Sequence, residues 1–142
     1  MKKILFGLFA VAMLAACSKD NDSGTPNNNS SETTIATQLS SGTWDVHYFV
    51  YNTDQTKAYS NYSFVFKKDS TLIVTDLGKS FNGGWYTTKR LDGSVQVSIT
   101  IASLTSIQLL NNDWKVAANS GTLITLKDYE NDNNAELHLK KR

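Results

Sequence analysis

The only cysteine of this 142-residue chain is the residue whose type and position most clearly suggest chemistry. Cys17 follows Leu14-Ala15-Ala16 at the end of an uncharged apolar run that begins at Ile4. An intrachain disulfide is excluded because Cys17 has no partner, which leaves the thiol as a nucleophile for modification. Lys2 and Lys3 precede the run, and the run is too short to span a bilayer, a pattern typical of a secretory signal peptide.

The four residues Leu14-Ala15-Ala16-Cys17 resemble the lipobox of bacterial lipoproteins. The resemblance implies that the Cys17 thiol receives a diacylglycerol, that residues 1–16 are removed as a signal peptide, and that the new amino group is acylated. Stable anchoring takes two or more acyl chains, which such a cysteine supplies. The alternative is an ordinary signal peptide that happens to contain a cysteine.

The charge of the mature chain argues against two classes of partner. Removal of residues 1–16 lowers the Lys and Arg count from 14 to 12 and leaves 13 Asp and Glu, a net charge of −1. No basic excess favours nucleic acid or anionic lipid. We therefore expect no nucleic-acid partner, and membrane attachment through the acyl chains alone.

Residues 17–40 form a polar segment that we predict to be a disordered tether carrying the lipidated cysteine. It begins Ser18-Lys19-Asp20-Asn21-Asp22, which resembles the acidic export tag that carries some lipoproteins to the outer cell surface. We expect an exported protein held at the outer membrane, on its periplasmic or cell-surface face. Ile35 and Leu39 lie four residues apart near the end of the segment, a spacing that suits one or two helical turns.

From Thr43 onward the apolar residues alternate with polar ones, which predicts half-buried β-strands. Turn-forming residues separate the strands, among them Asn82-Gly83-Gly84 and Asp92-Gly93. A spacing of three in residues 103–112 predicts a short helical or irregular connection. The expected strands are 43–52, 59–67, 71–77, 84–90, 94–101, 113–119, 122–128 and 134–140.

Eight short antiparallel strands would leave two exposed sheet edges unless the sheet closes. The predicted fold is therefore all-β, a small eight-stranded up-and-down antiparallel barrel over residues 41–142, with a short helical turn before it. An eight-stranded barrel is just wide enough to be filled by side chains or to hold one small ligand.

Gly42-Thr43-Trp44 resembles the Gly-X-Trp that opens the first strand of lipocalins, after a short helix that closes one barrel end. Residues 59–74 with 83–86, and the segments 109–116, 121–128 and 135–141, resemble small lipocalin-like bacterial lipoproteins. This resemblance implies a lipocalin-like barrel. It also departs from that family, because full lipocalins place a late arginine across the tryptophan, whereas the two arginines here are Arg90 and Arg142.

Apolar residues on the predicted inward faces are candidates either for the lining of a ligand pocket or for a packed core. Core filling is the simpler interpretation, because so short a barrel has little interior to spare. These candidates are Trp44, Val46, Tyr48, Tyr62, Phe64, Phe66, Trp85, Val97, Ile99, Trp114 and Leu137.

Residues suited to metal binding or catalysis do not form a recognisable motif. His47 and His138 fall on outward faces, and two histidines do not complete a zinc site. The loop from Asp128 to Asn134 is rich in oxygen ligands but lacks EF-hand spacing, and no nucleophile elbow is present. We expect no catalytic residues, no metal and no cofactor.

Two functions remain open from the sequence. The first is a membrane-anchored lipoprotein whose lipocalin-like domain binds a small hydrophobic ligand in the barrel. The alternative is a structural or accessory outer-membrane lipoprotein that contacts a partner protein and has no ligand pocket. The volume and lining of the barrel interior distinguish the two.

Overall fold

The computed structural model describes residues 30–102, 106–130 and 134–142. Cys17 and most of the predicted tether lie outside these residues. The elements are α1 (Glu32–Leu39), β1 (Thr43–Tyr51), β2 (Thr53–Asp54), η1 (Thr56–Tyr59), β3 (Tyr62–Phe66), β4 (Thr71–Asp76), β5 (Lys79–Lys89), β6 (Val95–Ile101), η2 (Ser106–Leu110), β7 (Asn112–Asn119), β8 (Leu123–Asp128) and β9 (Glu136–Lys141). Within these residues, no helix has the length and apolar character needed to cross a membrane.

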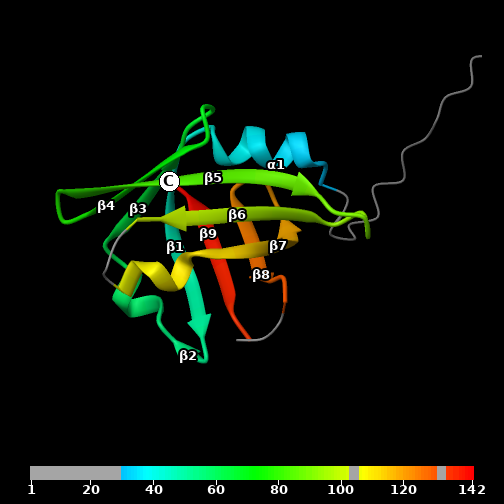
Figure 1. Cartoon of the computed structure of the whole chain (residues 1–142). Helices are drawn as coiled ribbons and strands as arrows, with labels where there is room; N and C mark the ends of the chain where they lie inside the picture. Colours follow the sequence, from blue (N-terminus) through cyan, green and yellow to red (C-terminus); the bar gives the residue numbers. More distant parts are fainter. Residues whose placement is uncertain (1–29, 103–105, 131–133) are drawn as a thin grey trace, which may run out of the picture.

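The strands form a closed antiparallel barrel, because β1 pairs with β3 on one side and with β9 on the other. Each intervening strand pairs with its neighbour in the sequence, and the two-residue β2 only extends the end of β1. The predicted all-β, eight-stranded up-and-down barrel is confirmed (Figure 1). Closure leaves none of the eight long strands as a free edge.

One predicted turn is wrong, and β5 is consequently longer than expected. Asn82, Gly83 and Gly84 lie within β5, whereas the chain reverses at Leu77-Gly78, where φ is 44° and 83°. Gly83 is instead required by close packing between strands. A Cβ at this position would lie 2.4 Å from the carbonyl oxygen of Thr100 on β6. Glycine thus marks a close backbone approach here, as it does at some positions within strands.

A β-bulge in β1 changes which side chains face the interior. The pairing of β1 with β9 shifts between Val46, opposite Leu139, and Tyr48, opposite His138. The extra residue reverses the alternation, so Phe49 is fully buried while Tyr48 is 37% exposed. The expectation that Tyr48 faces the interior is therefore wrong.

Helix α1 closes the end of the barrel at which β1 begins, and it lies alongside β5 (Figure 1). Ser31 caps the helix, since its hydroxyl accepts a hydrogen bond from the Thr34 N–H at 3.2 Å. Ile35 and Leu39 are fully buried against the barrel. The helical turns expected here are thus part of the folded domain, which begins before the predicted boundary at residue 41.

The antiparallel order gives the barrel two distinct ends. The α1 end comprises α1, the β3–β4 turn, the β7–β8 hairpin and the end of β9. The β5–β6 hairpin reaches Tyr129, which follows β8. The opposite end comprises the β4–β5 turn, η1, η2 and the β8–β9 connection. The short helical connection expected within residues 103–112 corresponds to η2, which helps to close this opposite end.

Candidate ligand cleft at the α1 end of the barrel

Most of the candidate pocket or core residues lie inside the barrel. Tyr62 is partly buried beside the core, and Tyr48 is on the outside. Together with the other buried apolar residues they form one continuous cluster. The nine that are buried are Trp44, Val46, Phe64, Phe66, Trp85, Val97, Ile99, Trp114 and Leu137.

The three tryptophans each fasten a connecting segment to the barrel. The indole N–H of Trp44 donates to the Leu39 carbonyl at 2.9 Å, and that of Trp114 donates to the Leu110 carbonyl at 3.0 Å. Trp85 donates to the Lys67 carbonyl at 2.9 Å. A buried tryptophan needs such a partner for its N–H. These side chains therefore have structural roles inside the barrel.

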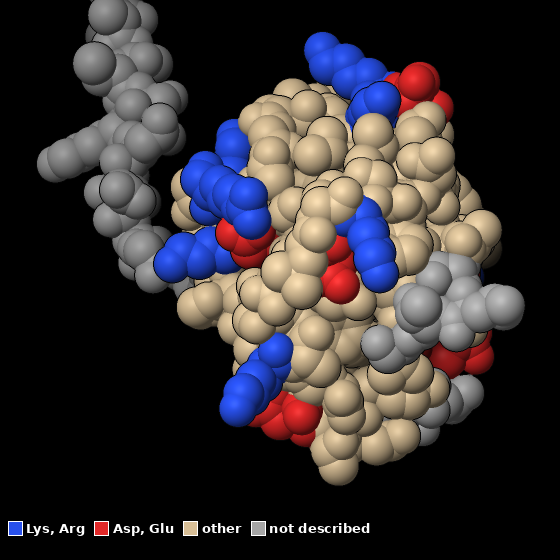
Figure 2. Space-filling view, turned by 90° about the vertical axis from the view of Figure 1, so that its left-hand side faces the viewer, with Lys and Arg blue, Asp and Glu red and all other residues tan. Residues whose placement is uncertain are grey.

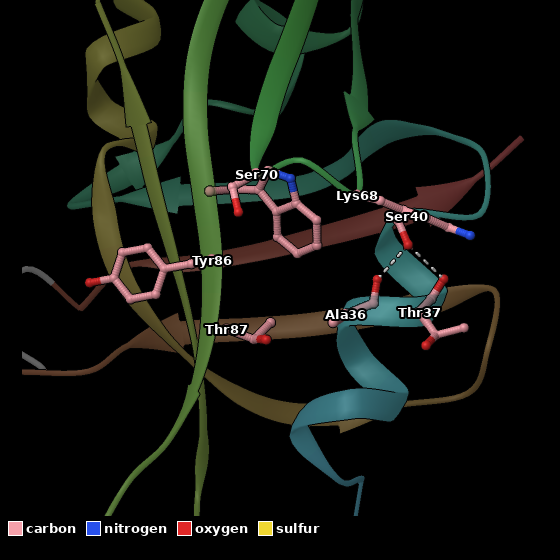
Figure 3. A pocket seen from close by; sticks show the side chains of 8 residues that line it. Ala36, Thr37, Ser40, Lys68, Ser70, Tyr86 and Thr87 are labelled. Atoms are coloured by element: carbon pink, nitrogen blue, oxygen red, sulfur yellow. Dashed lines mark hydrogen bonds between the residues drawn. The ribbon is translucent and has the colours of Figure 1, made fainter.

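A cleft of about 380 Å³ opens between α1, the β3–β4 turn and β5. Alternation along β5 turns Thr87 toward α1 and Tyr86 away from it (Figure 3). Trp85 lies two residues before Thr87, so its side chain is on the same face of β5. It has 6% of its surface exposed and lines the cleft. The full lining is Ala36, Thr37, Ser40, Lys68, Ser70, Trp85, Tyr86 and Thr87.

The polar groups of the cleft are held in place by local hydrogen bonds. The Ser40 hydroxyl donates to the Ala36 carbonyl at 2.8 Å, and the Trp85 backbone N–H donates to the Ser70 carbonyl at 2.9 Å. Lys68 is exposed in the β3–β4 turn and lies on the same edge of the cleft as Ser40 (Figure 3). The cleft thus combines an aromatic wall, hydroxyl groups and one ammonium group.

Sequence reasoning found only Trp85 among the residues that line this cleft. Ala36, Thr37 and Ser40 belong to the segment expected to be tether, and Lys68 and Ser70 belong to an ordinary turn. The helical spacing of Ile35 and Leu39 was the one signal that α1 packs on the barrel. Nothing in that spacing indicates which strand α1 meets.

The two histidines lie outside the barrel and do not form a ligand set. His47 is exposed, whereas the Nε2 of His138 lies 2.7 Å from a carboxylate oxygen of Glu136. The ring of Tyr48 packs on His138 with centroids 5.0 Å apart. In the described residues, no three His, Cys, Asp or Glu side chains are grouped so as to hold a metal.

The acidic loop is described only at its two ends, because residues 131–133 lie outside the described residues. Asp128 is 6% exposed, and its carboxylate accepts the Glu130 N–H at 3.2 Å. This bond stabilises the turn that follows β8. The described part of the loop thus has a structural explanation.

Arg142 connects the end of β9 to β1, the pair of strands that closes the barrel. The Nε of Arg142 donates to both carboxylate oxygens of Asp45, at 2.9 and 2.8 Å, and its backbone N–H donates to the Thr43 carbonyl. These hydrogen bonds raise the pKa of Arg142. Arg142 therefore binds the carboxylate next to Trp44 along β1 and fastens the end of β9 to β1.

A second polar cluster lies on the outer face of β6 and β7. The amide of Gln96 donates to the Ser98 hydroxyl at 2.8 Å, and Ser98 donates to Asp113. Gln96 and Ser98 are almost fully buried, and the Oε1 of Gln96 has no hydrogen-bond partner among the described residues. Nearby, the guanidinium of Arg90 lies 4.5 Å from the ring centre of Tyr129. Alternation alone would have placed Gln96 and Ser98 in solvent.

A comparison with known families matches the N-terminal residues of the sequence. Residues 1–18 match the family model of the prokaryotic membrane lipoprotein lipid attachment site. The chain carries a lipoprotein attachment site. This match covers the predicted signal peptide and includes Cys17.

The barrel has a counterpart among solved structures. The crystal structure of a DUF4847 family protein from Bacteroides vulgatus matches with a TM-score of 0.56 and 15% sequence identity. The match covers 76% of this chain and 97% of the other chain. At this identity the likeness shows the fold alone. No curated protein matches the sequence significantly.

Proposed function

We propose that this lipoprotein is held at the outer membrane and binds a small amphiphilic anion in the cleft between α1 and β5. The observation that carries the proposal is the combination of Trp85 and Lys68 in one cleft of about 380 Å³. Small-molecule sites are commonly concave, about 300–1,000 Å³ in volume, and apolar with a few polar groups. An apolar group would pack against Trp85, and an acid would pair with Lys68.

The packed barrel interior supports a site at the mouth over a site within the barrel. The buried side chains form one continuous cluster from Trp44 near α1 to Trp114 near η2. A ligand inside the barrel would have to displace these side chains, at a cost comparable to core repacking. A ligand in the cleft only needs to displace water.

The composition of the cleft favours binding over catalysis. Its lining, drawn from the described residues, contains hydroxyl groups and one lysine but no carboxylate or imidazole to act as a general base. The Ser40 hydroxyl is already hydrogen bonded to the helix backbone. We therefore propose a binding protein without enzymatic activity.

The location at the outer membrane rests on the attachment site together with the acidic stretch Ser18–Asp22 that follows Cys17. Contact with a partner protein, the alternative function, stays a prediction. Purification of the lipoprotein from solubilised outer membranes would test it, and recovery without a stoichiometric partner would count against it.

The ligand proposal is tested by NMR on the mature lipoprotein in phosphatidylcholine nanodiscs, with octanoate as the probe. Each tryptophan contributes one indole N–H signal, so the three signals report separately on Trp44, Trp85 and Trp114. We expect octanoate to shift the Trp85 signal most. Octanol, which lacks the acid, should bind more weakly.

Two variants sharpen this test, and a third is the matched control. Lys68→Gln should weaken octanoate binding without changing octanol binding, and Ala36→Phe should block both by filling the cleft. Lys79→Gln changes an exposed lysine at the opposite end and should leave binding as it was. Equal shifts at all three indoles, or octanoate binding that survives Ala36→Phe, would contradict the proposal.

A further inference from the structure

A second cleft, of about 480 Å³, lies on the outside of the barrel between the β5–β6 hairpin and the residue that follows β8. Small-molecule sites commonly have volumes of about 300–1,000 Å³. The second cleft shares no lining residue with the cleft between α1 and β5, so the two can be occupied independently. Its lining is Thr88, Lys89, Arg90, Leu91, Asp92 and Tyr129.

The strand order explains how Tyr129 reaches the hairpin. β6 and β7 lie between β5 and β8 in the sheet, and the Tyr129 N–H donates to the Asp113 carbonyl on β7 at 3.0 Å. The Arg90 side chain extends from the end of β5, and its guanidinium lies 4.5 Å from the centre of the Tyr129 ring. This contact therefore spans the two strands between β5 and β8 and forms one wall of the second cleft.

The position of Arg90 over Tyr129 prepares it to bind an anion. A guanidinium that lies over an aromatic ring keeps N–H donors along its edge for hydrogen bonds in its own plane. Hydrogen bonding to Tyr129 raises the pKa of Arg90, and the nearby carboxylates of Asp113 and Asp92 add to this effect. Tyr129 thus restrains Arg90, which lowers the entropy lost when a ligand binds.

The turn that carries the lining residues is well defined, and its carboxylate already has partners. The Gly93 N–H donates to the Arg90 carbonyl at 3.0 Å. The Asp92 carboxylate accepts the Ser94 N–H at 2.9 Å and the Ser94 hydroxyl at 2.6 Å. It also lies 3.6 Å from the Nζ of Lys115. Asp92 is therefore part of the turn and does not neutralise Arg90 directly.

The charges of this hairpin are arranged differently from those on another face of the barrel. On the face that Figure 2 shows, basic side chains lie beside acidic ones. Among the described residues, neither Lys89 nor Arg90 forms an ion pair with a carboxylate. Asp113, the other acid near Arg90, accepts the Ser98 hydroxyl. The second cleft thus presents two cations that the described carboxylates leave unpaired.

We propose that the second cleft binds a small organic acid through the guanidinium of Arg90. The edge of a guanidinium matches a carboxylate or a phosphate, each of which accepts two parallel hydrogen bonds. Lys89 adds a second positive charge, and the apolar part of the acid packs against Leu91, which is fully exposed. The proposal does not depend on ligand binding between α1 and β5.

The two arginines of the chain provide a selective readout. Arg90 and Arg142 each contribute one Nε–H signal to the NMR spectrum of the isotope-labelled mature lipoprotein in phosphatidylcholine nanodiscs. Mildly acidic pH slows the exchange of these protons with water. Arg142 is held by Asp45 and serves as the internal reference.

Three probes of similar shape distinguish the chemistry of the ligand. Benzoate and phenyl phosphate carry the two anionic groups that a guanidinium binds, and benzamide is the neutral counterpart of benzoate. We expect an acid to shift the Arg90 signal and to leave that of Arg142 in place. A stronger effect of benzoate identifies a carboxylic acid as the ligand class, and a stronger effect of phenyl phosphate identifies a phosphate ester.

Variants of the two contacting residues test the geometry, with the backbone N–H signal of Gly93 as the readout. Arg90→Lys keeps the charge but loses the planar edge, and should weaken binding of the acid about tenfold. Arg142→Lys is the matched control and should leave binding unchanged. Tyr129→Leu should weaken binding severalfold, whereas Tyr129→Phe, which keeps the ring under Arg90, should restore most of it.

The two exposed hairpin leucines give a second matched pair. Leu91→Ala should weaken benzoate binding severalfold, because the ring of benzoate loses its apolar contact. Leu77→Ala, in the β4–β5 turn, should have no effect, although Leu77 is 81% exposed.

Ala36→Phe separates the two clefts, because it fills the cleft beside α1 and should leave the Arg90 shift unchanged. Loss of that shift in Ala36→Phe would assign the effect to the α1 cleft and overturn the proposal. Equal shifts of both arginine signals, benzamide binding as strong as that of the acids, or unchanged affinity in Arg90→Lys would also overturn it. A Trp85 signal that octanoate leaves in place would contradict the site beside α1 only.

Discussion

At the α1 end of the barrel, Trp44 donates its indole N–H to the last residue of α1, and at the opposite end Trp114 donates to the last residue of η2. Each end is thus closed by a short helical segment fastened to a buried tryptophan. The ends differ in what this closure leaves outside. The α1 end retains the cleft between α1 and β5, whereas η1 and η2 bury Tyr59, Ile107 and Leu110 at the opposite end.

This difference indicates that the packed core and the functional surface are separate features of the barrel. The buried core is continuous from one end of the barrel to the other. Exposed residues at either end can therefore be substituted without disrupting the packing of the core. We expect the lipid anchor to decide attachment to the membrane, and buried residues at both ends to contribute to the stability of the barrel.

Loss of the lipid attachment point should give the largest effect. Cys17→Ser should abolish lipidation and release the protein from washed membranes, while the circular dichroism spectrum remains that of the folded barrel. The reason is that Cys17 is not among the residues that form the barrel. Fractionation after a high-salt wash is the measurement, and a variant that stays in the membrane would show that the lipobox interpretation is wrong.

The tryptophans at the two ends should contribute similarly to stability. Trp44→Ala and Trp114→Ala should each lower the free energy of unfolding by about 3–5 kcal/mol, because both rings are fully buried. Urea denaturation followed by circular dichroism measures both. A near-neutral result for one variant would show that the core does not extend equally through the two ends.

Alkaline pH should weaken the opposite end selectively. Burial raises the pKa of Tyr59 to about 12, and the ring of Tyr59 packs edge-on against Phe49. The folded state therefore keeps the phenol proton after the unfolded state has lost it. Stability should fall as pH rises from about 10 to about 12. Denaturation at several pH values should show a smaller decline for Tyr59→Phe, and an equal decline would assign the effect to other groups.

The exposed ion pairs should give the smallest difference. Arg142→Gln should lower stability by about 1 kcal/mol or less, because the pair with Asp45 has two short hydrogen bonds but is exposed to solvent. Lys127→Gln at the opposite end breaks a 3.7 Å pair with Glu136 and should be close to neutral. Thermal denaturation compares the two variants. A larger loss of stability for Lys127→Gln would show that the pair with Glu136 contributes more than the pair with Asp45.

Much of the fold could be predicted because each strand carries its own alternation. Val95, Val97, Ile99 and Ile101 alternate without interruption, and all four are buried in β6. Tyr48 was misplaced because a β-bulge inserts one residue without an evident sequence signal. The sequence predicts a turn at Gly83 because it does not reveal how closely β5 approaches β6.

The cleft could be predicted only in part, since it is formed by residues from three separate elements. Trp85 stood out by its type, whereas Lys68 and Ser70 gain significance only from their position beside α1. The packing of α1 on β5 connects segments about fifty residues apart, and no local pattern encodes it.

By itself, the sequence determined the attachment site, the strand class and the antiparallel order, because signal-peptide chemistry and strand alternation depend on neighbouring residues. Only the tertiary structure decided that aromatic side chains fill the barrel and that a cleft remains between α1 and β5. Those features depend on which distant segments meet when the barrel closes, and neither composition nor local sequence specifies these contacts.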